Sequence, residues 1–143
     1  MKRSLTIIVV GAAMSWLGLS AGAQSGDTLR ARLSPVPVEA ATVAGITGSG
    51  SATATLTGTT LAITGTFEGL RSPATVAHLH LGMKGVRGPV IFDLTVSKAT
   101  SGTIGGKLTL NRAQVEDLKK DRFYVQINSE KAPEGNLWGW LLP

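Results

Sequence analysis

The sequence has no cysteine and few ring-bearing side chains: one tyrosine, three tryptophans, three phenylalanines and two histidines in 143 residues. Without cysteine there is no disulfide and no thiol nucleophile, so packing and hydrogen bonding alone must stabilise the fold. No serine stands in a Gly-x-Ser-x-Gly motif, and the nine acidic residues are dispersed along the chain. A serine nucleophile needs a base and an orienting group around it. We therefore identify no catalytic residue, and the sequence favours a non-catalytic protein.

The N-terminus has the three parts of a secretory signal peptide. Lys2 and Arg3 precede a mostly apolar run over residues 5–19, and small residues follow at 21–23. A run of about 15 residues is shorter than the roughly 20 that a membrane-spanning helix needs. We therefore expect residues 1–23 to be cleaved and the remainder to form one domain, residues 24–143, with no transmembrane segment. Such a protein is exported, either to the periplasm or to the extracellular medium.

The charge of the expected domain is modest. Cleavage after residue 23 leaves twelve basic and nine acidic side chains, a net charge of +3. The basic residues fall in small separate groups, such as Arg30 with Arg32 and Lys84 with Arg87. Nucleic-acid binding requires a concentrated basic face with stacking aromatic side chains. We therefore expect no nucleic-acid partner, and we expect the partner to be an unidentified protein or a cell-envelope ligand.

Apolar and polar residues alternate with a period of two through most of the chain, which predicts β-strands separated by glycine and proline turns. Between two strands, Asn111 and Gln114 form a capping-box pattern that predicts a short helix over residues 111–120. The last strand is expected over residues 137–142. The sequence thus predicts an all-β antiparallel fold, a Greek-key-like β-sandwich or barrel of about eight strands with one short helix. The side chains expected to face the core include Ala77, Leu79 and Leu81 on one strand and Val90, Phe92, Leu94 and Val96 on the next.

Four segments share their order and spacing with one protein family. They are residues 33–38, the strand end at residues 65–70, the His-x-His strand with its glycine-containing loop at 77–90, and residues 124–139. Together they resemble the CHRD domain, a module first named from chordin and widespread in exported microbial proteins. The resemblance covers almost all of the expected domain and implies a β-sandwich, although a fold name does not confer a biochemical role. It implies a non-catalytic binding or scaffolding module outside the cytoplasm.

The loop after the His-x-His strand has a regular pattern of glycines. Gly82, Gly85 and Gly88 recur at every third position, and Pro89 follows the last of them. This pattern suits a loop that needs positive φ angles or a close approach of another chain segment. A phosphate-binding loop would need a helix after it and a lysine at another position. We therefore assign these four residues a structural role.

The only two histidines, His78 and His80, are two residues apart on one strand, so both rings leave the same face with their Cα atoms roughly 6.5 to 7 Å apart. Because Leu79 is expected to face the core, the histidines lie on the outer face. Two imidazoles at this spacing can bind one copper or zinc ion when neighbouring strands supply further ligands. A His-x-His strand after a Gly-Thr strand end also resembles the copper-zinc superoxide dismutases. CHRD sequences commonly have a histidine where this chain has Asn128, and an amide oxygen is a poor ligand for these metals.

Two histidines are fewer ligands than a redox copper site or a structural zinc site uses. Three alternatives remain: weak or no metal binding, a metal site completed by another residue or a second molecule, and a superoxide dismutase. Without a metal, His78 and His80 would hydrogen-bond to the glycine-containing loop and fix its course.

Two tryptophans occupy positions near the C-terminus where the family pattern has polar residues. Trp138 and Trp140 alternate with inward-facing residues, so both indoles are expected on the outer face of the last strand. Exposed there, they would form an interface anchor or a stacking platform. The alternative is that the segment at residues 35–44 folds over them. The expected binding surface therefore comprises His78, His80, Asn128, Trp138 and Trp140.

Overall fold

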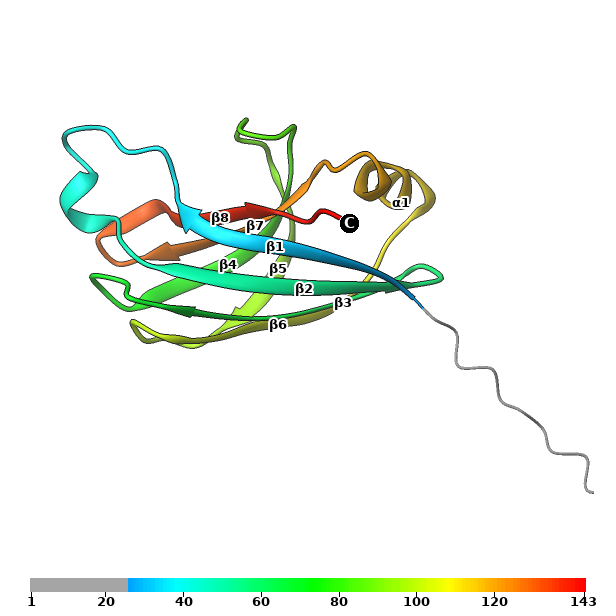
Figure 1. Cartoon of the computed structure of the whole chain (residues 1–143), viewed down its shortest axis with the longest axis horizontal. Helices are drawn as coiled ribbons and strands as arrows, with labels where there is room; N and C mark the ends of the chain where they lie inside the picture. Colours follow the sequence, from blue (N-terminus) through cyan, green and yellow to red (C-terminus); the bar gives the residue numbers. More distant parts are fainter. Residues whose placement is uncertain (1–25) are drawn as a thin grey trace, which may run out of the picture.

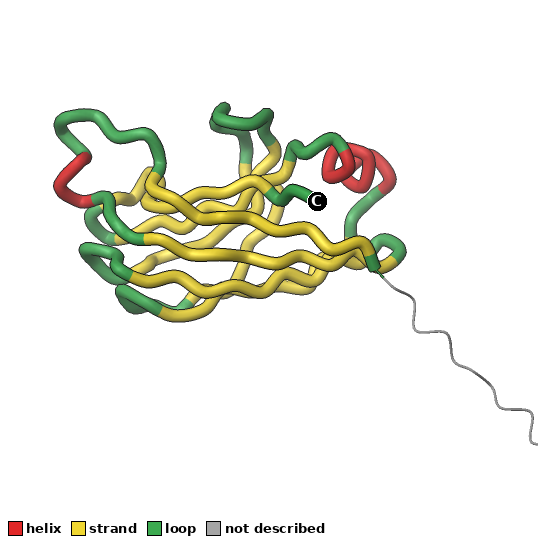
Figure 2. Tube along the Cα trace, in the orientation of Figure 1, coloured by secondary structure: helices red, strands yellow, loops and turns green. Residues whose placement is uncertain are grey.

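The computed structural model describes residues 26–143, which form a closed barrel of eight antiparallel strands (Figure 1). The expected signal peptide, residues 1–23, lies outside the described residues and stays a prediction. One turn of 3-10 helix, η1 (Val43–Gly45), and one α-helix, α1 (Arg112–Lys119), lie outside the barrel wall (Figure 2). The strands are β1 (Asp27–Pro35), β2 (Ser49–Thr57), β3 (Thr60–Glu68), β4 (Ala74–Leu81), β5 (Val90–Val96), β6 (Gly102–Thr109), β7 (Phe123–Ser129) and β8 (Ala132–Trp140).

The strand order around the barrel is β1-β2-β3-β6-β5-β4-β7-β8, so the chain crosses over between β3 and β4 and between β6 and β7. This confirms the all-β prediction with one short helix. The barrel closes where β1 pairs with β8, with Ser34 opposite Trp138 and Pro35 opposite Leu137. A bridge between Arg30 and Leu142 continues this seam toward the other end of the barrel.

Period-two alternation assigns the core-facing side of most strands correctly. Leu33, Leu79 and Ile127 are fully buried and belong to one cluster of aliphatic and phenylalanine side chains inside the barrel. Burial of a large aliphatic side chain contributes about 1.5–3 kcal/mol, so this cluster is the main source of stability in a chain without disulfides. The outer positions of β2 and β3 carry mostly serine and threonine.

The helix forms where the capping pattern predicts it. The side chain of Asn111 accepts a hydrogen bond from the backbone N–H of Gln114 at 2.8 Å. The side chain of Gln114 in turn accepts from the backbone N–H of Asn111 at 2.9 Å, which completes the capping box. Leu118 is buried against the main core, so the helix covers one end of the barrel.

Two predictions about strands are wrong in detail. Val90 was expected to face the core, yet it is 47% exposed. The reason is a register shift: Leu79 pairs with Phe92 but His80 pairs with Val90, so Ile91 is extra and the alternation of β5 changes at its start. The last strand also begins at Ala132 and not at residue 137, because residues 132–136 continue the hairpin with β7.

A second, smaller apolar cluster lies on the outer face of the barrel. It consists of side chains from β7, β8 and the β1–β2 loop (residues 36–48): Val36, Ile46, Tyr124, Ala132 and Trp138, with Trp140 packed against them. Figure 1 shows that the β1–β2 loop and the β4–β5 loop (residues 82–89) project from the same side of the barrel. The sheet β4-β7-β8 therefore has a covered outer face, and the candidate site lies there.

Candidate functional site

Antiparallel pairing places five ring-bearing residues, here called the aromatic cluster, on the outer face of β4, β7 and β8. His80, Tyr124 and Trp140 are direct cross-strand neighbours and form one row. His78 and Trp138 flank Gln126 in the adjacent row. Because each residue is two positions from its counterpart in the other row, all of these side chains point to the same side. The aromatic cluster comprises His78, His80, Tyr124, Trp138 and Trp140.

The rings of the cluster contact one another across the strands. His80 stacks on Tyr124 with ring centroids 4.7 Å apart and an interplanar angle of 15°. Tyr124 also contacts Trp140 at 4.6 Å between centroids, and Trp138 meets Trp140 edge-on at 4.8 Å. Aromatic pairs at these separations contribute about 0.5–1.5 kcal/mol each beyond burial of area. The cluster is therefore a packed unit, with Tyr124 at its centre.

The polar atoms of the first row bind both ends of the β4–β5 loop. The Nδ1–H of His80 donates to the carbonyl of Gly88 at 2.9 Å. The hydroxyl of Tyr124 accepts from the backbone N–H of Gly88 at 2.9 Å. At the other end of the loop, the indole N–H of Trp140 donates to the carbonyl of Gly82 at 2.9 Å. Three neighbouring rings thus hold a single loop in place.

His80 is in an unusual electrostatic position. Only 7% of its surface is exposed, and its Nε2 is buried without a hydrogen-bond partner among the described residues. A carbonyl can only accept, so the bond to Gly88 assigns the proton of the neutral ring to Nδ1. Burial lowers the pKa of His80 below its ordinary value of 6.5, and the nearby charges of His78 and Arg87 act in the same direction. The ring is therefore neutral at pH 7.

The glycines of the loop have the two roles that their spacing indicates. A Cβ on Gly88 would overlap the carbonyl oxygen of Leu81, and a Cβ on Gly82 would lie 2.6 Å from the carbonyl oxygen of Val86. Gly85 instead has a φ of +77° and open space around it, so it serves the turn. Pro89 closes the loop, and its carbonyl accepts from the backbone N–H of Leu81 at 3.0 Å.

His78 does not hydrogen-bond to the loop. Its Nε2 lies 3.4 Å from a carboxylate oxygen of Asp93, whose side chain is 91% exposed. The prediction that both histidines fix the loop is therefore correct for His80 and wrong for His78. The reason is that the loop backbone bonds to the cluster at Gly82 and Gly88, and these bonds are made with the row that contains His80, whereas His78 lies in the adjacent row.

The donor set around the histidine pair does not make a complete copper or zinc site. Within residues 26–143, no group of three or more His, Cys, Asp or Glu side chains is placed to hold one ion. Asn128, expected in the position of a third ligand, has its amide oxygen bonded to the side chain of Gln126 at 3.0 Å. Its amide nitrogen donates to the carbonyl of Pro133 at 3.0 Å. Asn128 therefore stabilises the β7–β8 hairpin.

The tryptophans are covered. Trp138 is 8% exposed, and Val36 and Ile46 of the β1–β2 loop belong to the same apolar cluster. The guanidinium of Arg87 lies 5.9 Å from the centroid of the Trp138 ring. Of the two alternatives for the indoles, the structure has the one in which the segment after β1 folds over them. Trp140 is only partly exposed, and its N–H is already bonded to the loop.

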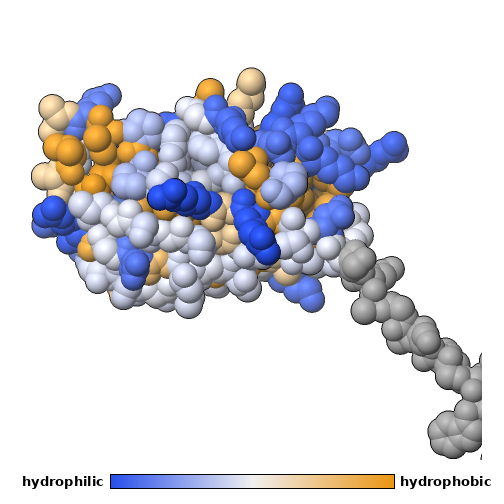
Figure 3. Space-filling view, viewed as in Figure 1, coloured by the Kyte–Doolittle hydropathy of each residue, from blue (hydrophilic) through white to orange (hydrophobic). Residues whose placement is uncertain are grey.

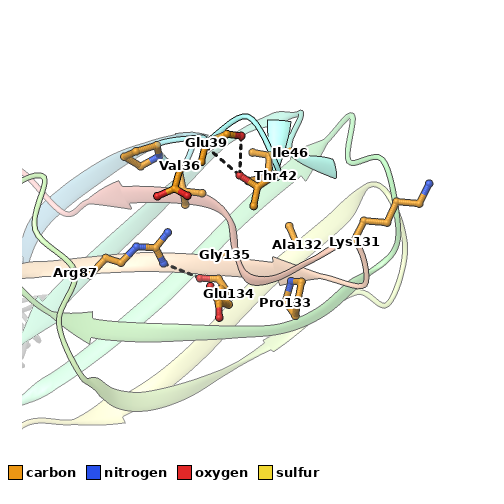
Figure 4. Close-up of a pocket in the computed structure, with 11 residues that line it drawn as sticks. Val36, Glu39, Thr42, Ile46, Arg87, Lys131, Ala132, Pro133, Glu134 and Gly135 are labelled. Carbon is orange, nitrogen blue, oxygen red and sulfur yellow. Dashed lines mark hydrogen bonds between the residues drawn. The ribbon is translucent and has the colours of Figure 1, made fainter. Parts of the chain in front are cut away.

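The cover leaves one cavity of about 310 Å³ between the β1–β2 loop and the start of β8 (Figure 4). Its apolar wall includes Val36 and Ile46. Arg87 reaches into this region from the β4–β5 loop and donates to the carbonyl of Glu134 at 2.7 Å, so residues of both loops meet here. The remaining charged side chains of the lining are those of Glu39, Lys131 and Glu134.

The β1–β2 loop is fixed at its far end by one buried amide side chain. The side chain of Asn136, fully buried, donates to the carbonyl of Thr47 at 2.8 Å. Its oxygen accepts from the hydroxyl of Ser129 at 2.8 Å. The loop therefore rests on β8 through hydrogen bonds as well as through Val36 and Ile46.

A family comparison agrees with this architecture. The CHRD domain model matches residues 29–141, which include every strand of the barrel in whole or in part. The chain belongs to the CHRD domain family. No curated protein and no solved structure gives a significant match to it. In the part of this CHRD domain that the structure describes, no helix is long and apolar enough to cross a membrane.

The sequence located most of the cluster of this CHRD domain but missed its centre. His78, His80, Trp138 and Trp140 lie together as expected, and Asn128 lies beside Gln126 at the edge of the group. Tyr124, which touches three of the rings, was not expected to contribute, although it shares the outer face of β7 with Asn128. Arg87 was also missed, because no local pattern indicates that a loop arginine reaches β8.

Proposed function

We propose that this CHRD domain is a non-catalytic, extracytoplasmic binding module that recognises a protein or a cell-envelope ligand through its β1–β2 and β4–β5 loops. The observation that carries the proposal is that three side chains of the aromatic cluster form hydrogen bonds to the β4–β5 loop. His80, Tyr124 and Trp140 each bond to the β4–β5 loop and so present a loop of fixed shape. A preformed loop loses little conformational entropy on binding, which favours recognition.

The aromatic cluster thus supports the surface and is not itself the surface. Met83 and Val86, at the tip of the supported loop, are 66% and 55% exposed, whereas Tyr124 is 1% exposed. Neighbouring exposed apolar side chains mark contact sites more often than apolar residues scattered singly over a surface do. The family membership supports the same class of function, because the CHRD domain is a module and not a catalytic motif.

A binding assay with matched variants tests the proposal. The wild-type protein is immobilised and exposed to a fractionated cell envelope, in parallel with Met83→Asp/Val86→Asp and with Ala62→Asp/Ala99→Asp. Both double variants remove two exposed apolar side chains and add two negative charges, but the second pair lies on β3 and in the β5–β6 loop. We expect binding by the wild type and the control pair only. Equal binding by all three proteins would rule out recognition through the loop.

A second candidate function is metal binding, and one observation favours it. Among the described residues, the buried Nε2 of His80 has no hydrogen-bond partner, and the ring centroids of His78 and His80 are 5.8 Å apart. Copper or zinc would satisfy this nitrogen, but the pair supplies only two imidazoles, so a second molecule would have to complete the coordination.

Metal analysis separates the two candidates. The protein is purified without an affinity tag and its copper and zinc contents are measured. Stoichiometric metal that His80→Ala and His78→Ala both remove would favour the metalloprotein. Substoichiometric metal that neither substitution changes would exclude it.

A further inference from the structure

The exposed hydrophobic side chains of this domain are concentrated on one side. Within residues 26–143, the exposed large hydrophobic residues are Val38, Val43, Val76, Met83, Val86 and Val90. Val76 is the least exposed of them, at 38%, and is the only one outside the two projecting loops and the residue that follows the β4–β5 loop. Orange atoms at the tips of these loops are visible in Figure 3. Solvation of apolar surface is unfavourable, so a group of exposed apolar side chains at projecting loop tips indicates a contact surface.

The β4–β5 loop combines these apolar side chains with positive charge. Lys84 and Arg87 lie between residues 81 and 92, a stretch with no acidic residue. In the described part of the chain, neither cation is in an ion pair. Glu39 and Glu134 line the cavity that Arg87 also lines, so the uncompensated charge of the loop is that of Lys84, next to Met83 at the tip.

The tip is also held away from the barrel. Both ends of the loop are bonded to the aromatic cluster, and Val86 donates its backbone N–H to the carbonyl of Met83 at 2.9 Å, which closes a turn at the tip. Met83 and Val86 therefore remain exposed because the loop cannot fold them back without breaking these bonds. A lysine beside a rigid, projecting apolar tip is complementary to a surface that is negatively charged outside and apolar beneath.

From this arrangement we infer that the β4–β5 loop docks the domain on an anionic phospholipid surface, with Met83 and Val86 entering the interface and Lys84 contacting the headgroups. The inference rests on the proposed function, and it specifies the cell-envelope ligand. Protein-binding hot spots are rich in exposed Trp, Tyr and Arg. Here the tip is aliphatic and the Tyr and Trp residues of the described chain are buried or half-buried beneath the loops. Apolar side chains that enter the headgroup region beside basic residues are typical of interfacial membrane binding.

Vesicle cosedimentation tests the inference. The purified protein is mixed with vesicles of phosphatidylcholine alone or with 30% phosphatidylglycerol, about a third of the lipid, as is usual for an anionic surface. We expect binding to the anionic vesicles, weakened by salt, and little binding to the neutral ones. Met83→Asp/Val86→Asp should reduce the partition coefficient by roughly tenfold or more, and Lys84→Glu by about fivefold. Ala62→Asp/Ala99→Asp is the matched control, and any contribution of residues 1–25 is common to all variants.

The outcomes distinguish docking on lipid from the more general proposal of a binding module. Vesicle binding that depends on Met83, Val86 and Lys84 supports both. Failure to bind vesicles, with loop-dependent capture of a protein from the detergent-extracted envelope, overturns the lipid inference and leaves the binding module. Vesicle binding that is equal in all variants overturns the inference, because the loop then plays no part. Unchanged far-ultraviolet circular dichroism of the variants shows that a loss of binding is not a loss of fold.

Discussion

His80 and Tyr124 stack on each other and bond to the same glycine: the imidazole donates to the Gly88 carbonyl, and the phenol hydroxyl accepts from the Gly88 N–H. The two rings come from strands β4 and β7, which are 44 residues apart along the chain at this pair and hydrogen-bonded in the sheet. Gly88 of the β4–β5 loop is therefore hydrogen-bonded to side chains of two strands. Removing either ring group should loosen the same loop.

Tyr124→Phe removes the phenol hydroxyl alone. The backbone N–H of Gly88 then loses its acceptor in a half-buried position, and loss of such a partner costs about 1–3 kcal/mol. We expect the free energy of unfolding in urea to fall by that amount, with an unchanged m-value. A double-mutant cycle with His80→Phe should show coupling, since both groups hold one residue. Strictly additive losses would show that the two bonds act independently.

Gly88→Ala tests the close approach of the loop ends. A Cβ at Gly88 would overlap the Leu81 carbonyl, so the loop must shift and its bonds to the cluster must lengthen. Overpacking of this kind costs about 1–3 kcal/mol. The expected cleavage of residues 1–23 removes Trp16, and Trp16→Phe does the same in uncleaved protein, so Trp138 and Trp140 are the two tryptophans left. We expect a red shift of the fluorescence as Trp140 becomes more exposed. Gly85→Ala is the control: it strains a positive φ but faces open space, so it should not alter the emission.

Stability should depend on the ionisation of His80. Its pKa in the folded protein is lowered by burial, whereas in the unfolded chain it has the ordinary value of 6.5. The full contribution is therefore present above pH 6.5, and it declines as the pH falls below 6.5, since the unfolded chain then binds a proton that the folded protein does not. Urea denaturation at pH 8 and at pH 5.5, with a chelator present, measures the decline. His80→Gln should have the shallower pH dependence; a slope equal to that of the wild type would assign the effect to other groups.

Asn136→Ala should release the β1–β2 loop. Its buried side chain joins the Ser129 hydroxyl to the Thr47 carbonyl, and the substitution leaves both without that partner. We expect a loss of about 1–3 kcal/mol and faster proteolysis between residues 37 and 47. Asn128→Ala, on the half-exposed edge of the same hairpin, is the comparison and should leave the cleavage rate unchanged.

The sequence predicted which side chains face the core better than it predicted which segments cover the outer face. Alternation with a period of two is a local property, so it placed Leu79 inside and His80 and Trp140 outside correctly. Burial on the outer face depends on residues distant in sequence, and no local pattern indicates that Val36 packs on Trp138. The same limit explains Tyr124, whose importance comes from neighbours on two other strands. The error at Val90 has another origin: one extra residue in β5 reverses the alternation, and Ile91 gives no sign of it.

The seam between β1 and β8 has a consequence for synthesis. The first strand of the barrel needs the last one as its neighbour, and the Arg30–Leu142 bridge lies next to the C-terminal residue. A chain that leaves the ribosome N-terminus first can form the hairpin of β1 and β2 early, but the other edge of β1 has no partner until β8 has been synthesised. Closure of the barrel therefore waits for β8 and joins the first and last strands of the domain. Any factor that keeps β8 occupied would leave this edge of β1 unpaired and the barrel open.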